Sequence, residues 1–423
     1  KVIMKKIFIY SLMFIATTTF GACSSEIKDG TTDIDSWPDP VEEFDVKLSH
    51  PCMLHTAADF KRVKEKVNAN AQPWTDGWNI LIANDKAQET YTANPVAKLI
   101  RGGGSKEEPE ADNYSKAMYD VAAAYQLGLR WKISGDDKYA DAAVKILNAW
   151  ATTCKSINGD SNKYLAAGIY GYQFANAAEI LRDYSGWAAA DFNAYKTWLS
   201  DLFYPLNKDF LERHNGTCIS HYWTNWDVCN MASGLAIGIL CDDKEKINYN
   251  LNYFKKGAGN GSINQAVTSL HTLNGQVLGQ GQESGRDQGH ATLVISLYGA
   301  FCQMAYNIGV DLFAYDNNKL LALCEYTAMY NVDTTIADTD MPFTKYTNCE
   351  GETHTIISNV GRGTLRPAWE LIYNHYAKVK KISAPWSQKF AEKVRPEGGG
   401  GNYGPNSGGY DQMGFGTLMY TQE

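Results

Sequence analysis

Apolar residues recur at intervals of three and four positions along most of the chain beyond residue 50. This spacing places them on one face of an α-helix, so the pattern predicts a largely helical protein. Alternation of apolar and polar residues, which is typical of a strand, is expected only over 353–360. The expected helices span residues 56–67, 73–86, 114–133, 137–154, 164–184, 191–206, 226–241, 244–254, 264–270, 284–308 and 318–331.

Short turns separate neighbouring helices, which predicts antiparallel helical hairpins. The turn 134–136 contains a glycine, the residue that most readily adopts the backbone angles of a tight turn. The hairpins show no strict sequence period, so a repeat-protein solenoid is not expected. Such helices can close into an α/α toroid, and we expect an all-α, incomplete toroid of roughly six to seven hairpins. The glycine-rich stretch 395–420 is expected to be irregular and to wrap over the surface or over a cleft.

Residues 4–23 have the features of an export signal. Two lysines precede the apolar stretch Ile7–Ile15, and the small residues Gly21 and Ala22 come directly before Cys23. The apolar stretch is too short for a membrane-spanning helix. A cysteine in this position is typical of a bacterial lipoprotein, in which Cys23 carries the lipid and becomes the mature N-terminus. The alternative is an ordinary secretory signal with an incidental cysteine.

This interpretation divides the chain into three parts. Residues 1–23 are the expected lipoprotein signal, 24–45 an acidic, proline-containing tether, and 46–423 a single folded domain with its C-terminal loop segment. The expected location is the outer membrane, on its periplasmic or its outer face, with the protein anchored by the lipid. A monomer is expected.

Composition narrows the classes of partner. The net charge of −8 and the absence of a basic run argue against nucleic acid. Aromatic residues make up 12% of the chain, with 26 Tyr and 11 Trp, and such a surplus in an exported protein suits stacking on sugar rings. Cysteines outside the cytoplasm can pair, and Cys218 and Cys229 are the nearest neighbours in a polar region.

A metal site is not expected from the sequence. His50, Cys52 and His55 offer ligand types at short spacing, but no further cluster in the sequence completes a tetrahedral site. The chain contains no phosphate-binding loop, no dinucleotide fingerprint and no nucleophile elbow. We therefore expect no cofactor.

The strongest candidate chemistry lies in the stretch QESGRDQGH. Glu283, Arg286, Asp287 and His290 follow one another at helical offsets. Within the helix expected over 284–308, Glu283, Arg286 and His290 would share one stripe, with Asp287 at its border. The alternative is an exposed, salt-bridged first turn, because helix N-termini favour charged residues.

A second polar and aromatic cluster, HYWTNW, contains His221, Tyr222, Trp223, Asn225 and Trp226. Asn225 begins the helix expected over 226–241 and would serve equally well as its N-cap. The histidine has the alternative of a partly buried structural role. The aromatic residues either stack on sugar or belong to the core.

Four segments carry a resemblance to a known family: WKISGDDKYADAAVKILNAW, GYQFANAAEIL, HYWTNWDVCNMASGLAIG and QESGRDQGHATL. Over roughly 54–376 the chain resembles the alginate-lyase-like superfamily of polysaccharide lyases, and it is most similar to a glucuronan and alginate lyase family of gut Bacteroidota. The resemblance implies an α/α toroid that cleaves an anionic uronate polysaccharide by β-elimination. Glu283 and Arg286 match an E-x-x-R that precedes the catalytic tyrosine in one alginate lyase family. Leu293 occupies the position of that tyrosine, so Tyr298 is the tyrosine chosen here.

The resemblance also implies roles for these residues. His290 would be the base or a further neutralising group, and Asn225 and Arg286 the groups that neutralise the uronate carboxylate, with His221 as a further catalytic candidate. The family motif does not place its tyrosine in this chain, and Tyr298 is the acid predicted instead. The expected substrate-binding residues are Trp223, Trp226, Tyr222, Glu283, Gln282, His354 and Tyr403.

Two alternatives remain at this point. An α/α toroid glycoside hydrolase would need two carboxylates across a cleft, for which Glu283 with Asp227 or Asp287 are available. A non-catalytic glycan-binding lipoprotein would account for the aromatic residues and the lipid, but not for the charged stretch that ends at His290.

Overall fold

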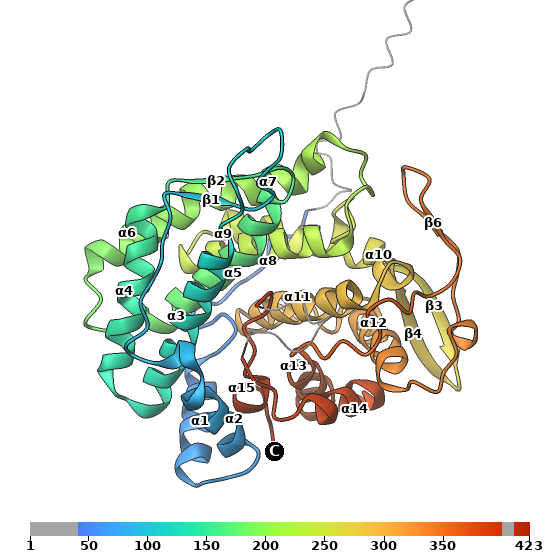
Figure 1. Cartoon of the computed structure of the whole chain (residues 1–423). Coiled ribbons are helices and arrows are strands. Elements are labelled where there is room, and N and C mark those ends of the chain that lie inside the picture. Colours follow the sequence, from blue (N-terminus) through green and yellow to red (C-terminus); the bar gives the residue numbers. More distant parts are fainter. Residues whose placement is uncertain (1–40, 400–409) are drawn as a thin grey trace, which may run out of the picture.

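Helical hairpins dominate the computed structural model, which describes residues 41–399 and 410–423 (Figure 1). Consecutive helices pack along one another in the order α4, α3, α5, α8, α11, α12 and α14. The helices are α1 Ala57–Asn68, α2 Trp74–Ala83, α3 Ser115–Ser134, α4 Asp137–Thr153, α5 Lys163–Leu181, α6 Ala189–Leu202, α7 Tyr204–Arg213, α8 Thr224–Leu240, α9 Lys244–Lys256, α10 Ile263–Ala266, α11 Gln288–Asn307, α12 Tyr315–Val332, α13 Trp369–Tyr373, α14 Pro385–Val394 and α15 Gly416–Met419. The predicted all-α class agrees with this arrangement. No described helix is both long enough and apolar enough to cross a bilayer.

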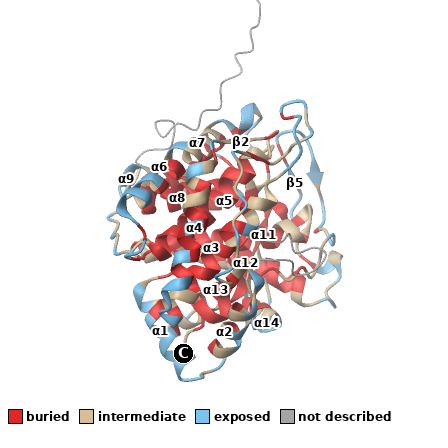
Figure 2. Ribbon diagram, turned by 60° about the vertical axis from the view of Figure 1, so that its left-hand side comes forward, coloured by how far each residue is buried: buried red, intermediate tan, exposed pale blue. Residues whose placement is uncertain are grey.

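Helices α5 and α8 form the centre of the molecule, and Figure 2 shows them almost wholly buried. Glycines on α5 allow the close approach. A Cβ atom on Gly168 would lie 2.4 Å from Cys229 Sγ, and one on Gly171 would lie 2.1 Å from Ser233 Oγ. Side chains larger than hydrogen at these positions would therefore force the two helices apart.

Three short two-stranded sheets accompany the helices. β1 Lys98–Ile100 pairs in parallel with β2 Ser156–Asn158, and two antiparallel pairs follow later in the chain. The antiparallel pairs are β3 Val267–Leu273 with β4 Gln276–Gly281, and β5 Tyr346–Thr347 with β6 Thr353–His354.

The β3–β4 hairpin corrects the helix expected over 264–270. Only Ile263–Ala266 is helical, and the chain then turns back at Asn274-Gly275, where both residues have positive φ (51° and 81°). This dipeptide is a strong hairpin signal, because both central residues of the tightest hairpin turn need positive φ. The strand expected over 353–360 is also wrong beyond its first two residues.

The helix expected from residue 284 begins only at Gln288. Asp287 is its N-cap, with φ −166°, and its side chain accepts a hydrogen bond from the backbone N–H of His290. Glu283 lies in a preceding 3-10 turn, and Arg286 lies between the two elements. The predicted single stripe of Glu283, Arg286 and His290 on one helix is therefore wrong. The capping preference of aspartate outweighs the helical spacing here.

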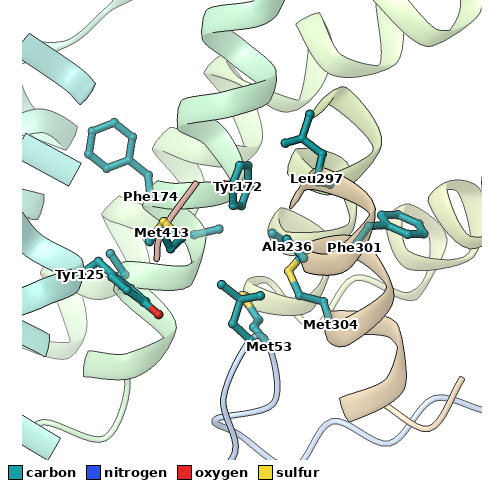
Figure 3. Close-up of a cluster of buried hydrophobic side chains, with 14 of the residues drawn as sticks. Met53, Tyr125, Tyr172, Phe174, Ala236, Leu297, Phe301, Met304 and Met413 are labelled. Atoms are coloured by element: carbon teal, nitrogen blue, oxygen red, sulfur yellow. The ribbon is translucent and has the colours of Figure 1, made fainter. Parts of the chain in front are cut away.

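The described part of the C-terminal tail packs into the protein interior, whereas the sequence predicted a segment wrapped over the surface or over a cleft. Phe415 and Leu418 are fully buried. Figure 3 shows Met413 close to Tyr172, with Tyr125 nearby. The expected signal, the tether up to residue 40, Cys23 and Tyr403 lie outside the described residues.

One disulfide joins Cys218, in the loop after α7, to Cys349, in the loop between β5 and β6. Cys229, the nearest neighbour of Cys218 in that polar region of the sequence, is instead a buried free thiol on α8. Closeness in the sequence does not identify the disulfide partner here, because the fold brings together two cysteines 131 residues apart. The disulfide holds the β5–β6 hairpin next to the start of α8.

A buried carboxyl group makes folding stability depend on pH. Glu397 is enclosed next to Glu370, which pairs with Arg395 at 2.6 Å. Burial, together with the negative charge of Glu370, raises the pKa of Glu397 from 4.5 to about 8. The protonated form is thus favoured in the folded protein. Its stabilising effect is complete below about pH 4.5 and is lost as the pH rises through about 8.

We expect Glu397→Gln to keep the hydrogen bond from the Glu370 backbone N–H (3.1 Å in the native protein) and to remove this titration. The variant should melt at a higher temperature than the native protein at pH 8 and at a similar temperature at pH 5. One pKa unit corresponds to about 1.4 kcal/mol, so a difference of a few kcal/mol is expected. Thermal melts across this pH range measure it. Exposed Glu107→Gln is the control, and equal pH dependence in both variants would contradict the assignment.

Candidate active site

A buried carboxylate, Glu283, organises the polar residues at the start of α8 and α11. Its side chain is only 3% exposed. Oε1 accepts hydrogen bonds from the backbone N–H (3.1 Å) and the side-chain Nδ2 (2.6 Å) of Asn225, and Oε2 accepts one from Arg286 at 3.1 Å. An unpaired buried carboxylate would cost several kcal/mol, so these donors are essential to it. Glu283 therefore orients Asn225 and Arg286, which corrects its expected role in direct substrate contact.

Gln282 supports the same corner of the molecule. Its Oε1 accepts from the backbone N–H of Thr224 at 2.7 Å and from the Thr224 hydroxyl at 2.8 Å. Together with Glu283, it satisfies N–H groups in the first turn of α8, where Trp223 provides no side-chain cap. Gln282 is 2% exposed, so it positions the helix, and the expected direct contact with substrate is corrected as well.

His290 lies beside this network and is held by Asp287. His290 Nδ1 is 2.7 Å from Asp287 Oδ2. An ionised carboxylate only accepts hydrogen bonds, so Nδ1 carries the proton and Nε2 keeps a free lone pair. Burial by itself would raise the pKa of Asp287, but the hydrogen bonds from His290 and the charge of Arg286 outweigh it and lower that pKa. The His290 side chain is 41% exposed and hence accessible.

Arg286 connects the two carboxylates and faces an aromatic ring. Its Nε lies 3.6 Å from Asp287 Oδ2, so Asn225, Arg286 and His290 are joined through Glu283 and Asp287. The structure thus brings these three predicted residues together, as expected, although they do not share a helix face. The guanidinium carbon of Arg286 lies 5.0 Å from the centroid of the Trp223 ring. With its side chain 27% exposed, Arg286 retains donors for an anion.

His354 extends the row of side chains that begins with Arg286 and Trp223. Its ring centroid is 5.6 Å from that of Trp223, and its Cβ covers Gly285, where an added Cβ would come within 2.5 Å. His354 Nε2 also lies 3.2 Å from Glu352 Oε1. The expected substrate-binding residues Trp223 and His354 therefore lie at the candidate site.

Tyr298 does not lie there, which corrects the predicted acid. It is fully buried, its hydroxyl donates to the carbonyl of Gly261 at 2.9 Å, and its ring packs edge-on against Phe254. Burial raises its pKa well above the ordinary value. A tyrosine enclosed in this way cannot reach a sugar.

Tyr346 is the tyrosine that the sequence analysis missed. Its hydroxyl accepts a hydrogen bond from Gln282 Nε2 at 3.0 Å. Tyr346 is directly opposite His354 in the β5–β6 ladder, so both side chains project from the same face of the hairpin. Burial raises the pKa of Tyr346, although its bonds to Gln282 and Ser220 oppose the shift. No local pattern marks this tyrosine, because the disulfide and the hairpin bring it to the site.

The remaining residues of the HYWTNW cluster have structural contacts. Tyr222 and Trp226 pack with Phe210, at ring-centroid distances of 5.1 and 5.9 Å, so they belong to a small aromatic core rather than to the site. This corrects their expected role in binding. His221 is half-buried, and its Nδ1 is 2.6 Å from Glu350 on the neighbouring loop.

A further group of charges lies next to His290 on its other side. Arg366 donates to the carbonyl of Gly289 at 3.1 Å and pairs with Asp411 at 3.3 Å. Burial raises the pKa of Asp411, while the charges of Arg366 and Arg101 oppose the shift.

Arg101 is the residue of this group that has donors to spare. Its guanidinium lies over the ring of Tyr114 at 4.9 Å and donates to the Tyr170 hydroxyl at 3.4 Å. It has no carboxylate within ion-pair distance among residues 41–399 and 410–423. The sequence analysis passed over it, although an arginine directly before three glycines was visible in the pattern.

Among the residues that the structure describes, the carboxylates predicted for a hydrolase are already engaged by other protein groups. Asp227 is fully buried, and its Oδ2 accepts from the Tyr253 hydroxyl (2.9 Å) and from the backbone N–H of Gly261 (3.0 Å). Glu283 and Asp287 are both engaged by cations. In the described part of the chain, the side chains with metal-ligand spacing lie elsewhere, around Cys52.

Comparison with known proteins identifies the fold and the family. The chain shares 14% identity with alginate lyase A1-III from Sphingomonas species A1 (TM-score 0.58; 91% of this chain and 100% of that one are covered). A variant of alginate lyase A1-III complexed with a tetrasaccharide gives the same identity and TM-score, with 91% and 99% covered. An alginate lyase from Bacteroides ovatus shares 13% identity (TM-score 0.56; 88% and 100% covered). These likenesses confirm the predicted α/α toroid fold.

No curated protein sequence matches the chain. The family model described as "Alginate lyase" matches residues 64–336, which is more than half of the chain. Because this match covers more than half of the chain, the chain belongs to the alginate lyase family.

Proposed function

We propose that this protein is a polysaccharide lyase that cleaves a uronate-containing polysaccharide by β-elimination. The observation that carries the proposal is the pairing of His290 with Asp287 next to Arg286, because it combines a histidine base of fixed tautomer with a carboxylate-binding cation. The glycoside hydrolase and the non-catalytic binding protein are not favoured. The carboxylates predicted for a hydrolase are engaged by other groups. A non-catalytic binding protein would not need a histidine held in one tautomer beside an arginine.

The reaction requires removal of the C5 proton of a uronate and departure of the O4 oxygen, which leaves a 4,5-double bond. The C5–H bond is weakly acidic next to an ionised carboxylate, so the carboxylate must be neutralised as negative charge develops. Arg286 is the proposed partner of that carboxylate. Asn225, which is 2% exposed and donates its Nδ2 to Glu283, is proposed to hold Glu283 in place rather than to touch the substrate. The N-termini of α8 and α11 carry partial positive charge, which supports the same interaction.

Proton transfer follows from the positions of the two remaining groups. His290 Nε2 has a free lone pair and is the proposed base for the C5 proton. Asp287 stabilises the imidazolium that forms, because it already accepts the Nδ1 proton. Tyr346 is the proposed acid for the departing O4 oxygen. Its hydroxyl accepts a hydrogen bond from Gln282, which directly precedes Glu283 in the chain.

Arg101 is proposed to bind the carboxylate of a neighbouring sugar. A uronate polymer carries one negative charge on each residue, and a second arginine without an ion pair near His290 suits such a repeat. Trp223 supplies an aromatic face of the kind on which sugar rings stack. Mannuronate, guluronate and glucuronate polymers all fit this description.

Purified protein should release unsaturated products from alginate or glucuronan. They are detected by the ultraviolet absorbance of the double bond conjugated to the carboxylate, which hydrolysis does not create. His290→Ala should lower kcat by about 10²–10⁴-fold, the usual contribution of a general base. The melting temperature should change little, because the side chain is partly exposed.

The matched control is His221→Ala, which removes a half-buried histidine that contacts Glu350 on the loop between β5 and β6. It should lower kcat far less than His290→Ala does. Reducing sugar without ultraviolet absorbance would indicate a hydrolase and would overturn the lyase proposal. Full activity of His290→Ala would overturn its role as the base.

The choice of tyrosine is tested by two substitutions that each remove one hydroxyl. Tyr346→Phe should lower kcat by about 10²-fold or more, because the proton donor to O4 is lost. Tyr298→Phe should retain most of the activity and lose stability, since the hydroxyl only bonds the Gly261 carbonyl. Steady-state kinetics and thermal melts on both variants provide the comparison. The reverse pattern would return the acid to Tyr298.

We further propose that Cys23 carries a lipid that anchors the protein to the outer membrane, on the basis of the signal-like sequence at residues 4–23. In a bacterial host, Cys23→Ala should move the protein from the membrane fraction to the soluble fraction. Fractionation followed by immunoblotting measures the distribution. An alanine variant that stays in the membrane would show that another feature provides the attachment.

A further inference from the structure

A cluster of metal-ligand side chains lies at the opposite end of α8 from the candidate active site. His50 Nδ1 is 2.6 Å from Glu179 Oε1 and 3.5 Å from Cys52 Sγ. These three ligand atoms lie within 4.8 Å of one another. About 25 Å separates Asn225 from Asp242 at 1.5 Å per helical residue, so this cluster is separate from the catalytic residues.

The cluster joins three parts of the chain that are distant in sequence. His50 and Cys52 belong to the segment before α1, Glu179 lies in the last turn of α5, and Asp242 follows α8. Cys52 and Glu179 are both nearly fully buried, while the His50 side chain is 16% exposed. One side of the cluster is therefore open to a water molecule as a fourth ligand.

We propose that His50, Cys52 and Glu179 form a structural site for a zinc-like divalent cation. Imidazole nitrogen, thiolate sulfur and carboxylate oxygen are the ligand types that zinc prefers. In a tetrahedral zinc site, nitrogen and sulfur ligands lie about 3.6 Å apart, which is close to the 3.5 Å between His50 and Cys52. Glu179 Oε1 has to move away from His50 by about 0.7 Å to admit the ion.

The surrounding residues form an outer shell suited to such a site. Asp242 Oδ1 lies 2.8 Å from His50 Nε2, which is the carboxylate–histidine arrangement that orients a metal-bound imidazole. Arg182 bonds the outer oxygens, Asp242 Oδ2 at 2.7 Å and Glu179 Oε2 at 3.4 Å. The other oxygen of each carboxylate, Glu179 Oε1 and Asp242 Oδ1, is therefore directed at His50.

Arg182 carries a positive charge next to the proposed cation site, and the balance of charges explains why it does not prevent the ion from binding. Without metal, protonated His50 and Arg182 neutralise Glu179 and Asp242, and Cys52 is a neutral thiol. The divalent ion binds as His50 and Cys52 each release one proton to solvent. The total charge of the five side chains and the ion together stays at zero, so Arg182 does not oppose the exchange.

The sequence suggested only the first part of this site. His55, the third residue of the HxCxxH spacing, bonds the Tyr125 hydroxyl at 2.6 Å and belongs to the core. Glu179, more than 120 residues further along, takes its place. The bound ion would fasten the segment before α1 to the ends of α5 and α8 and so stabilise the toroid.

The test uses the full chain, stripped with a chelator and then exposed to Zn²⁺ or Co²⁺. After desalting, elemental analysis should find one zinc per chain, and the Co²⁺ form should show a thiolate-to-cobalt charge-transfer band. Zinc should also raise the melting temperature, because it binds the folded state. Cys52→Ala and His50→Gln should each lose the retained zinc and the band.

Cys241→Ser is the matched control, since it removes a partly exposed thiol that lies outside the cluster, and it should retain both signals. Circular dichroism checks that each variant is folded, and Cys52→Ser serves if the alanine variant is not. Retention of no zinc by the native chain, or equal retention in the Cys52 and His50 variants, would show that the cluster is an ion pair only. Neither outcome affects the lyase proposal, because activity is not the readout.

Discussion

The candidate site depends on one buried charge, the carboxylate of Glu283. Low-dielectric surroundings penalise an isolated carboxylate heavily, and the protein offsets this with donors from two separate elements. Asn225 supplies two of these donors from the start of α8, and Arg286 supplies the third from the segment before α11. The requirement to satisfy this charge fixes the distance between the two helix starts. The residues that would bind substrate are therefore placed by the same interaction that stabilises the fold.

A second carboxylate performs a comparable task for His290. Asp287 accepts the backbone N–H of His290 as an N-cap and its Nδ1 proton as a hydrogen-bond partner. A single side chain thus starts α11, sets the tautomer of the histidine and limits its rotation. Because the helix cannot begin before its cap, Arg286 is left outside the helix, where it can reach Glu283 and Trp223. Catalytic geometry and helix capping are consequently one feature here.

The other side of the site is built by connections that are long in sequence. The disulfide between Cys218 and Cys349 holds the β5–β6 hairpin against the loop that precedes α8. That hairpin carries Tyr346 and His354 on one face. The elements of the toroid are mostly helices, yet its candidate substrate-facing groups lie at the start of a helix or in the segments between helices, where side chains can differ without disturbing helix packing.

The sequence by itself determined the helical class, the hairpin turns and the charged stretch around Arg286 and His290, because helical periodicity and capping depend on residues only a few positions apart. Tertiary structure decided which tyrosine lies at the site, since the disulfide and the β5–β6 hairpin bring Tyr346 there, whereas Tyr298 is buried in α11. It also decided the pairing of Asn225 with Glu283. These outcomes require contacts between residues tens to hundreds of positions apart, and spacing along a single chain carries no record of such contacts. Chemistry was therefore visible in the sequence, whereas its arrangement was not.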